Sequence, residues 1–473
     1  MGEEVFFNGI DGSTGGYLLD PLDVDVLAAA ISGAERNPDD EKKLKDWWGN
    51  RNLKHYAAQE GTDYKDLAST GWAVIFPYDV DPAIPKALKP LLDWRKSQAG
   101  QRYKEYSGPE GYRYKPGEMY ESKEDWLTRH NAAAWGAVNQ DFVPYNVLLV
   151  GSPEQIPYRF QTQLDVQYGV GRIHFDKAED YWNYANSVVS AEKQKLSLGK
   201  TASFFAVCNP DDPATNLSTE QLVRPLAASL SGQAGWTFST TAAEDAVKKN
   251  LERVLGGEDT PALLFTASHG MGFPDGHERQ ALDQGALLCQ DWPGPKQWRK
   301  PIGNDFYFSA DDVTDDSNVF GLVAFFFACY GAGTPKMDDF SRQAFKKREE
   351  IAPRDFLARL PQRMLAHPKG GALAVIGHVE RAWGYSFSEG KDGAQVTVFK
   401  SALKSLLDGF PIGYAFEYFN SRYAELSSDL TAALDDAEFG KVIPPADLAR
   451  KWTANNDARN YVVLGDPAVR LMA

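Results

Sequence analysis

The sequence predicts an α/β protein built on a mainly parallel β-sheet with helices packed around it. Short apolar runs typical of strands alternate along the chain with amphipathic stretches typical of helices. Several of the strand-like runs are apolar at nearly every position, which is typical of central strands covered on both faces. The alternation extends over most of the 473 residues, a length that ordinary domain sizes divide into about two or three domains.

The predicted elements follow one another in a regular order. Strands are predicted over residues 72–76, 146–150, 169–175, 202–207, 237–241, 262–266, 319–327, 371–376 and 461–464. Helices are predicted over residues 84–97, 123–138, 178–192, 219–230, 244–255, 353–366, 396–407 and 413–434. Residues 98–121 are rich in Gly, Tyr, Lys and Glu and indicate a long surface excursion. A seam near residues 196–200 predicts an N-terminal α/β subdomain, residues 1–197, and a second subdomain, residues 198–473.

Charge and cysteine content exclude several classes of protein. The net charge of −15 repels a nucleic-acid backbone, and the basic run at residues 346–348 is too short to form a patch, so no nucleic-acid partner is expected. Three cysteines, Cys208, Cys289 and Cys329, do not suit a disulfide framework, so catalysis is the expected use of sulfur. No apolar run approaches the ~18 residues of a membrane span, and the start MGEEVFF does not resemble a secretory signal. We therefore expect no membrane partner and a cytoplasmic location.

A histidine and a cysteine follow two successive buried strands. In PALLFTASHGMG the strand at residues 262–266 is followed by His269 and Gly270, and in AFFFACYGAGTP the strand at 319–327 is followed by Cys329. Functional groups gather outside the carboxyl ends of the strands in open α/β sheets, so an imidazole and a thiol are expected in one crevice. Cysteine catalysis needs a thiolate nucleophile and a histidine that protonates the leaving amine. The amides of Gly270 and Cys329 are the expected oxyanion donors.

These two motifs resemble the caspase-like cysteine peptidases of clan CD, and three further stretches resemble the gingipain branch of that clan. The stretches are YNVLLVGSPEQIPYRFQTQLDVQYGVGRIHF, GGALAVIGHVERAWG and YVVLGDPAVRL, and the matches run over about residues 145–471. The resemblance implies a caspase-like three-layer α/β/α sandwich with a smaller, gingipain-like N-terminal α/β subdomain. It also implies a cysteine endopeptidase that works without a cofactor, and it leaves room for a regulatory protein partner.

The resemblance further implies a specificity pocket. Asp165 matches the acidic residue of the gingipain pocket, and Trp383 matches the tryptophan that forms its wall. An aspartate in such a pocket pairs with arginine or lysine, so the implied substrate is a protein or peptide cut after a basic residue. His378 lies near the expected wall and is a candidate substrate contact. The alternatives are a turn cap for Asp165, core packing for Trp383 and a hydrogen-bonded structural role for His378.

Residues 273–318 depart from the gingipain pattern because this loop looks longer. It contains DDVTDDSN, an acidic cluster that is a candidate calcium site or a regulatory loop, with a solvated surface as the alternative. The candidate ligands are Asp311, Asp312, Asp315 and Asp316. No other metal site is expected.

Two further motifs do not predict a binding site, and two other functions remain possible for the same fold. GIDGSTGG, residues 9–16, lacks the Lys-Ser/Thr ending of a phosphate-binding loop, and Asp466 in LGDPAV is expected to fix a turn before Pro467. The sequence does not identify an acid that orients His269. A catalytically silent scaffold with the same fold, or an acyl-transfer enzyme that uses Cys329, remains an alternative to a peptidase.

Overall fold

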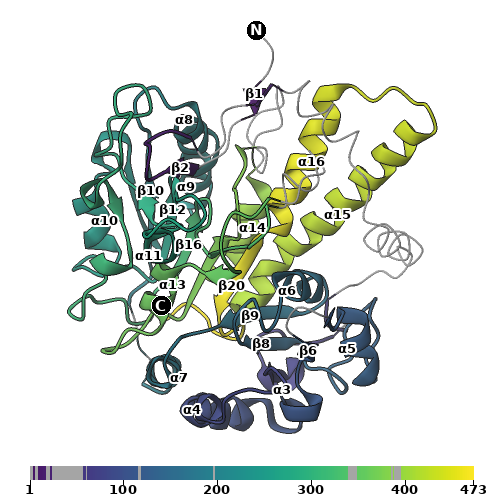
Figure 1. Ribbon diagram of the computed structural model, residues 1–473. Coiled ribbons are helices and arrows are strands. Elements are labelled where there is room, and N and C mark those ends of the chain that lie inside the picture. Colours follow the sequence, from purple (N-terminus) through teal and green to yellow (C-terminus); the bar gives the residue numbers. More distant parts are fainter. Residues whose placement is uncertain are drawn as a thin grey trace.

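A ten-stranded β-sheet forms the centre of the molecule (Figure 1). The computed structural model describes residues 4–5, 9–17, 22–23, 57–59, 61–115, 119–194, 196, 198–338, 349–384, 387 and 396–473. The basic run at residues 346–348 lies outside these described residues. The strand order is β11-β10-β12-β16-β19-β20-β9-β8-β4-β5. These strands are β4 (Trp72–Ile75), β5 (Tyr103–Tyr106), β8 (Asn146–Val150), β9 (Gly169–Ile173), β10 (Thr201–Ala206), β11 (Thr237–Ala242), β12 (Leu263–Ala267), β16 (Val323–Phe327), β19 (Ala374–His378) and β20 (Tyr461–Gly465).

The sheet consists of two parallel halves that run in opposite directions. The strands from β11 to β19 are parallel to one another, and so are the strands from β20 to β5. Within this described sheet, β19 and β20 form the single antiparallel pair. The carboxyl ends of β12 and β16 therefore lie at the same edge of the sheet as the amino ends of β20 and β9. The predicted fold class, α/β with a mainly parallel sheet, is confirmed.

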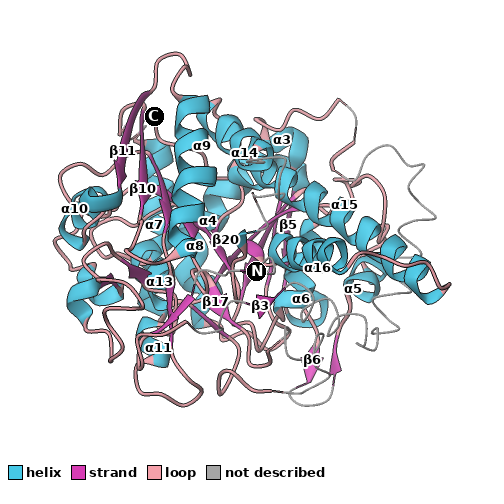
Figure 2. Cartoon of the chain, turned by 90° about the horizontal axis from the view of Figure 1, so that it is seen from above, coloured by secondary structure: helices cyan, strands magenta, loops and turns pink. Residues whose placement is uncertain are grey.

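Helices cover both faces of the sheet (Figures 1 and 2). The side chains of β4 show this, because Trp72 and Val74 join the core that contains α4 and α7, whereas Ala73 and Ile75 join the core that contains α5 and α6. This arrangement is the predicted three-layer sandwich. The helices are α3 (Leu67–Thr70), α4 (Ala83–Ala99), α5 (Lys123–Arg129), α6 (Tyr158–Asp165), α7 (Ala178–Lys193), α8 (Pro213–Ser218), α9 (Arg224–Leu230), α10 (Lys248–Val254), α11 (Gln280–Asp283), α13 (Arg359–Leu365), α14 (Thr397–Leu407), α15 (Ile412–Glu438) and α16 (Pro445–Arg459).

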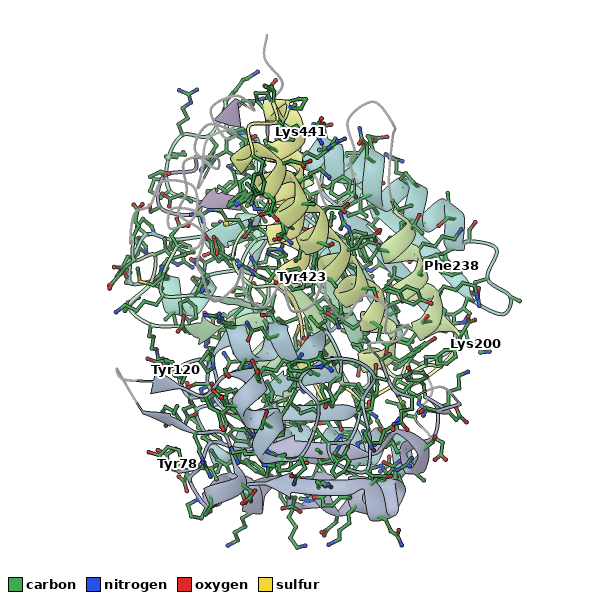
Figure 3. All side chains as sticks on the ribbon, turned by 90° about the vertical axis from the view of Figure 1, so that its right-hand side faces the viewer. Tyr78, Tyr120, Lys200, Phe238, Tyr423 and Lys441 are labelled. Carbon is green, nitrogen blue, oxygen red and sulfur yellow. The ribbon has the colours of Figure 1, made fainter. Side chains whose placement is uncertain are left out.

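The long helices α15 and α16 pack against each other as a hairpin. Figure 1 shows this hairpin in yellow, and Tyr423 and Lys441 mark it in Figure 3. Among the residues that the structure describes, no helix has both the length and the apolar character needed to cross a membrane.

A second, smaller sheet of four strands lies beside the carboxyl end of β12. Its order is β15-β14-β13-β2, and its strands are β2 (Gly9–Asp11), β13 (Gly270–Gly272), β14 (Leu287–Leu288) and β15 (Tyr307–Phe308). The expected long loop at residues 273–318 thus folds into α11, β14 and β15 rather than remaining a loop. Its own apolar core supports this sheet, with Met271, Trp292 and Tyr307 fully buried. The remaining short strands are β1 (Glu4–Val5), β3 (Leu22–Asp23), β6 (Tyr114–Lys115), β7 (Met119–Tyr120), β17 (Gly333–Thr334) and β18 (Phe356–Leu357).

The strand order follows the predicted division of the chain at residue 197. The strands from β11 to β20 come from residues after this point, and β9, β8, β4 and β5 come from residues before it. Pairing between β20 and β9 nevertheless joins all ten strands into one sheet. The division into two subdomains, residues 1–197 and 198–473, stays a prediction.

Asp466, just after β20, fixes the predicted turn and also binds the N-terminal half. Its Oδ1 accepts a hydrogen bond from the Ala468 amide at 3.0 Å and one from Trp72 Nε1 at 2.9 Å. Its Oδ2 lies 2.7 Å from Nε of Arg95, whose guanidinium also pairs with Glu192. Arg95 and Asp466 are both buried, so these contacts form an ion-pair network inside the molecule.

Candidate active site

His269 and Cys329 follow two neighbouring parallel strands of the sheet. β12 and β16 stay in register up to the pair Ala267 and Phe327, and the Ser268 amide donates to the carbonyl oxygen of Phe327 at 3.2 Å. The same register continued two residues further sets His269 beside Cys329, immediately past the ends of the strands. The two predicted residues therefore follow neighbouring strands at one edge of the sheet, and their joint role in catalysis stays a prediction.

Gly270 lies against the backbone of Cys329. A Cβ atom at position 270 would come within 1.8 Å of the Cys329 carbonyl oxygen, so any residue other than glycine would push the two strand ends apart. This close approach explains the glycine that follows the histidine. The role of the Gly270 and Cys329 amides as oxyanion donors stays a prediction.

Asp212 supplies the acid that the sequence analysis did not identify. It follows β10, the neighbour of β12, and its Oδ2 lies 2.7 Å from Nε2 of His269. Both side chains are fully buried. Burial by itself would raise the pKa of Asp212, but the attraction of His269 and hydrogen bonds from His269, Thr215 and Tyr17 lower it to about 2. Asp212 is therefore a carboxylate at neutral pH.

The bond to Asp212 gives the two nitrogens of His269 different roles. A carboxylate only accepts hydrogen bonds, so Nε2 carries a proton, and Nδ1 is the nitrogen that accepts a proton whenever the ring is neutral. Nδ1 is buried and has no hydrogen-bond partner in the described part of the chain. The rings of Tyr17 and Trp292 meet the imidazole edge-on, with centroids 5.8 and 6.4 Å away, and hold it in place. His269 is thus oriented, with one nitrogen free to move a proton.

The thiol of Cys329 is buried at the end of β16. Its Sγ accepts a hydrogen bond from the Ala382 amide at 3.2 Å. Burial raises the pKa of Cys329 above its ordinary value, and this bond and the charge of Arg381 only partly oppose the rise. In this closed arrangement the sulfur keeps its proton at neutral pH, so formation of the thiolate requires a base.

Residues 380–382, which contact the thiol of Cys329 through the Ala382 amide, are held by a buried ion pair. Arg381 binds both carboxylate oxygens of Asp338, at 3.0 and 2.9 Å, and also Oε1 of Glu380 at 2.7 Å. The Glu380 carbonyl oxygen accepts from the Tyr330 amide at 2.7 Å. Glu380 has a φ of 75°, which costs free energy in a residue other than glycine and is maintained here by its neighbours. This segment is therefore fixed directly against Cys329.

Asp165, the predicted specificity residue, is the last residue of α6 rather than the start of a strand. Its Oδ1 accepts from the Val170 amide at 3.2 Å, while its Oδ2 is buried and, among the residues described, has no partner. Burial raises the pKa of Asp165 well above its ordinary value, and the Val170 amide and Arg172 oppose this only in part. Val170 lies near the amino end of β9, at the same edge of the sheet as the carboxyl end of β16, where Cys329 lies.

Trp383 and His378 are brought together by Asp457, a residue of α16 that the sequence analysis did not single out. The Trp383 amide donates to Oδ1 of Asp457 at 2.7 Å. Nε2 of His378 lies 3.0 Å from the Asp457 carbonyl oxygen, and its Nδ1 lies 3.3 Å from the Glu380 carbonyl oxygen. Trp383 and His378 are both buried. Their predicted contacts with a substrate stay predictions, and α16 was absent from the predicted elements.

The four acids of the DDVTDDSN cluster point to four different basic residues. No group of three or more His, Cys, Asp or Glu side chains placed to hold a metal ion occurs in the described ranges. Calcium binding stays a prediction, and an ion would have to displace the existing pairs. These pairs are Asp311 with Arg359 (2.7 Å), Asp312 with Lys248 (2.7 Å), Asp315 with Arg363 (2.5 Å) and Asp316 with Lys369 (2.6 Å).

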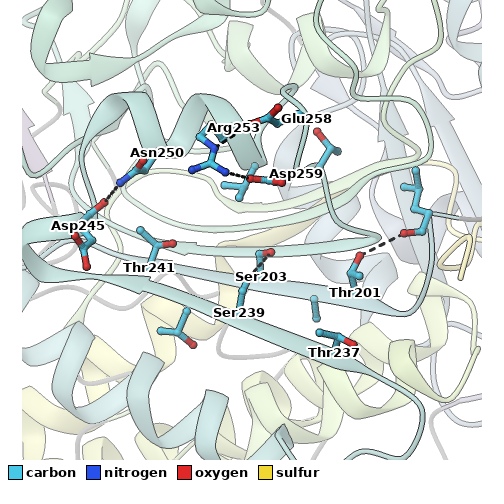
Figure 4. Close-up of a pocket in the computed structure, with 15 residues that line it drawn as sticks. Thr201, Ser203, Thr237, Ser239, Thr241, Asp245, Asn250, Arg253, Glu258 and Asp259 are labelled. Carbon is cyan, nitrogen blue, oxygen red and sulfur yellow. Dashed lines mark hydrogen bonds and ion pairs between the residues drawn. The ribbon is translucent and has the colours of Figure 1, made fainter.

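A hollow of about 600 Å³ lies over β10 and β11 (Figure 4). Hydroxyl groups of Thr201, Ser203, Ser239 and Thr241 line it, together with Arg253. None of the candidate catalytic residues lines this hollow. It is therefore separate from the site at the carboxyl ends of β12 and β16.

The likeness of this chain to known proteins lies among solved structures. No protein-family model matches the chain, and no curated protein sequence matches it. Several solved structures match it, and three of these align with most of the chain. A structure described only as that of a protease is 12% identical, with 86% of this chain and 80% of that chain covered and a TM-score of 0.47.

The other two structures are gingipains. The Arg-specific cysteine proteinase gingipain R is 12% identical, with 88% of this chain and 80% of that chain covered and a TM-score of 0.44. The complex of the pro- and mature domains of RgpB from Porphyromonas gingivalis is 13% identical, with 85% and 79% covered and a TM-score of 0.45. At such identities the likeness concerns the fold, and function is argued below from the chain's own residues.

Proposed function

We propose that this protein is a cysteine endopeptidase that cuts proteins or peptides after arginine or lysine. One observation carries the proposal: a buried aspartate holds Nε2 of His269, Nδ1 has no hydrogen-bond partner among the described residues, and Cys329 follows the neighbouring strand β16. A thiol with a raised pKa needs a neighbouring base, and an oriented imidazole supplies one.

In the proposed reaction Cys329 attacks the scissile carbonyl carbon while its proton passes to Nδ1 of His269. The amides of Gly270 and Cys329 stabilise the oxyanion, a contribution typically worth about 10²–10³ in rate for each donor. The carbon–nitrogen bond then breaks, and His269 gives its proton to the leaving amine. Water, deprotonated by His269, attacks the thioester, and this releases the new carboxylate and restores the thiol.

Asp165 is the proposed receptor for the basic side chain of the substrate. Its Oδ2 is buried and has no hydrogen-bond partner in the part of the chain that the structure describes, so an arriving guanidinium or ammonium group would meet an available acceptor. A cation would also lower the pKa that burial has raised, because it stabilises the ionised carboxyl. Trp383 is the proposed wall of this pocket.

The first prediction concerns the nucleophile. Replacing Cys329 by alanine should abolish cleavage of fluorogenic peptides that end in arginine or lysine, because no other group replaces the sulfur. Cleavage is measured by fluorophore release, with Cys208→Ala as the matched control. Cys208 is partly exposed, bonds Asn216 and should be dispensable.

The result also separates the proposed function from its rivals. A silent scaffold would cleave nothing and would not react at Cys329 with an acyloxymethyl ketone that carries a basic side chain. An acyl-transfer enzyme would react with small esters but not with peptides. Full peptide cleavage by Cys329→Ala would contradict the assignment.

A further inference from the structure

The N-terminal segment, residues 9–17, packs against the strand that follows His269. β2 pairs in parallel with β13, from Gly9 beside Gly270 to Asp11 beside Gly272, and forms the outer strand of the small sheet. Figure 1 shows β2, in purple, next to α8, the helix that Asp212 caps. The glycine-rich sequence GIDGSTGGY, which does not fit a phosphate loop, therefore has a place beside the candidate active site.

Apolar packing and backbone bonds hold this segment in one position. Ile10 is fully buried in the core of the small sheet. Gly12 donates to the Gly272 carbonyl oxygen at 2.6 Å and accepts from the Ile302 amide at 2.9 Å. A Cβ atom at Gly12 would come within 2.4 Å of the Phe273 ring, so glycine permits this close packing. The segment is thus a fixed part of the fold around His269.

Tyr17 ends the segment at the candidate site. Its hydroxyl donates to Oδ1 of Asp212 at 2.6 Å, while Oδ2 of the same carboxylate binds His269. The ring of Tyr17 also meets the imidazole edge-on. Burial and the nearby carboxylate raise the pKa of Tyr17, so its hydroxyl stays a neutral donor. Tyr17, Asp212 and His269 form one hydrogen-bonded chain.

This bond is one of the hydrogen bonds that set the rotation of the Asp212 carboxylate, and it is the shorter of the two to Oδ1. The torsion that turns a carboxylate about its Cβ–Cγ bond is soft, so hydrogen bonds decide where the two oxygens point. Without Tyr17, the donors that remain among the described residues are the Ala214 amide to Oδ1 at 3.2 Å, and the Thr215 hydroxyl at 2.5 Å and His269 to Oδ2. Rotation would carry Oδ2 away from Nε2 of His269 and release the imidazole from its orientation.

We propose that Tyr17 is a positioning residue of this active site and acts on His269 through Asp212, an inference that rests on the proposed peptidase function. It assigns the N-terminal segment a part in catalysis. Tyr17 touches neither the nucleophile nor the scissile bond, so its effect should appear in turnover rather than in substrate binding.

The test is the substitution Tyr17→Phe in the full chain, which keeps the ring and removes the hydroxyl. The loss of one charge-assisted hydrogen bond predicts a fall in kcat of about tenfold. We expect KM to change less than twofold and Tm to stay within about 2 °C. Tyr78→Phe, at an exposed tyrosine (Figure 3), is the control and should leave kcat unchanged. A kcat of Tyr17→Phe within twofold of the wild type would overturn the proposal.

A double-mutant cycle separates positioning from a general structural role. Asp212→Asn should itself lower kcat, and adding Tyr17→Phe should cause no further loss, because Tyr17 acts through the carboxylate that is already gone. If the two losses instead multiply, Tyr17 acts by another route and the proposal is wrong.

A second readout works without a peptide substrate. If the wild type cleaves no peptide, the proposed function fails, and the inference about Tyr17 is then read from the rate at which iodoacetamide alkylates Cys329, followed by mass spectrometry of that peptide. Tyr17→Phe should slow the alkylation several-fold, because a misplaced imidazole yields less thiolate. Equal rates in wild type and variant would overturn the inference.

Discussion

Asp211 and Asp212 are adjacent in the sequence but have different roles in the structure. Asp211 has a φ of 57° and forms an exposed ion pair with Lys296, whereas Asp212 is buried and binds His269. The turn at Asp211 decides which carboxylate faces inward, and CNPDDP does not encode this in a recognisable pattern. Cys329 and His269 stand out in the sequence because each follows an apolar strand and lies close to glycines, and their catalytic roles stay predictions.

A prediction at this scale concerns Asp165. Replacing it by asparagine removes the negative charge that the proposed pocket offers to an arginine side chain. A hydrogen bond to a charged group contributes more free energy than one between neutral groups, so kcat/KM for arginine substrates should fall about 10²-fold. Cleavage of peptide libraries by the wild type and the variant measures the change in preference. Asp176→Asn, at an exposed acid, is the matched control. An unchanged preference for basic residues in Asp165→Asn would contradict the pocket assignment.

The spacing of apolar residues predicts most of the strands and helices but not β5 and α16. Every predicted strand is present. Most of these strands are buried and apolar at successive positions, whereas β11 is a partly exposed edge strand. β5 was taken for part of a surface excursion, since its sequence YKEY is that of a partly exposed edge strand. α16 escaped detection because it buries polar residues, including Asn456 and Asp457, beside Leu448 and Trp452, which leaves little apolar periodicity.

The helix α15 carries a group whose ionisation should affect stability. Glu417 accepts a hydrogen bond from Tyr145 at the start of β8, and burial raises the pKa of Glu417 to about 7 from its ordinary value of 4.5. The folded protein therefore holds a proton that the unfolded chain releases between these values. Its contribution to stability is fully present below pH 4.5 and is lost as pH rises through 7.

Glu417→Gln should remove this dependence on pH and raise the free energy of unfolding at pH 8 by about 3 kcal/mol. Urea denaturation at pH 5, 6 and 8 measures the effect. Glu425→Gln, at an exposed position of the same helix, serves as the control. An equal pH dependence in Glu417→Gln and wild type would show that Glu417 does not hold the extra proton.

At the scale of the whole molecule, the order of the strands could not be predicted. The sequence predicts the strands themselves, but not that β20 joins two parallel halves that run in opposite directions. That arrangement depends on contacts between residues far apart in the chain, such as Asp466 with Arg95 and Trp72. Asp466 reads as a turn residue from its neighbours, and only the fold shows its second role.

This buried network should contribute strongly to stability. Asp466→Asn leaves the Arg95 charge with one partner fewer in a buried site, and breaking such a pair typically costs about 3–5 kcal/mol. Asp93→Asn removes an exposed pair with Lys89, and should cost less than about 1 kcal/mol. The free energies of unfolding in urea compare the two variants. A loss at Asp466 no larger than that at Asp93 would contradict the role of the network.

The position of β20 between the two halves also has a consequence for synthesis of the protein. A ribosome makes residues 461–465 after every other strand of the sheet, so a nascent chain that ends before residue 461 has β19 and β9 as unpaired edges. Such edges are sites at which strands of other chains pair and aggregate. Translation that pauses late in this chain is therefore the stage at which it most needs protection by a chaperone.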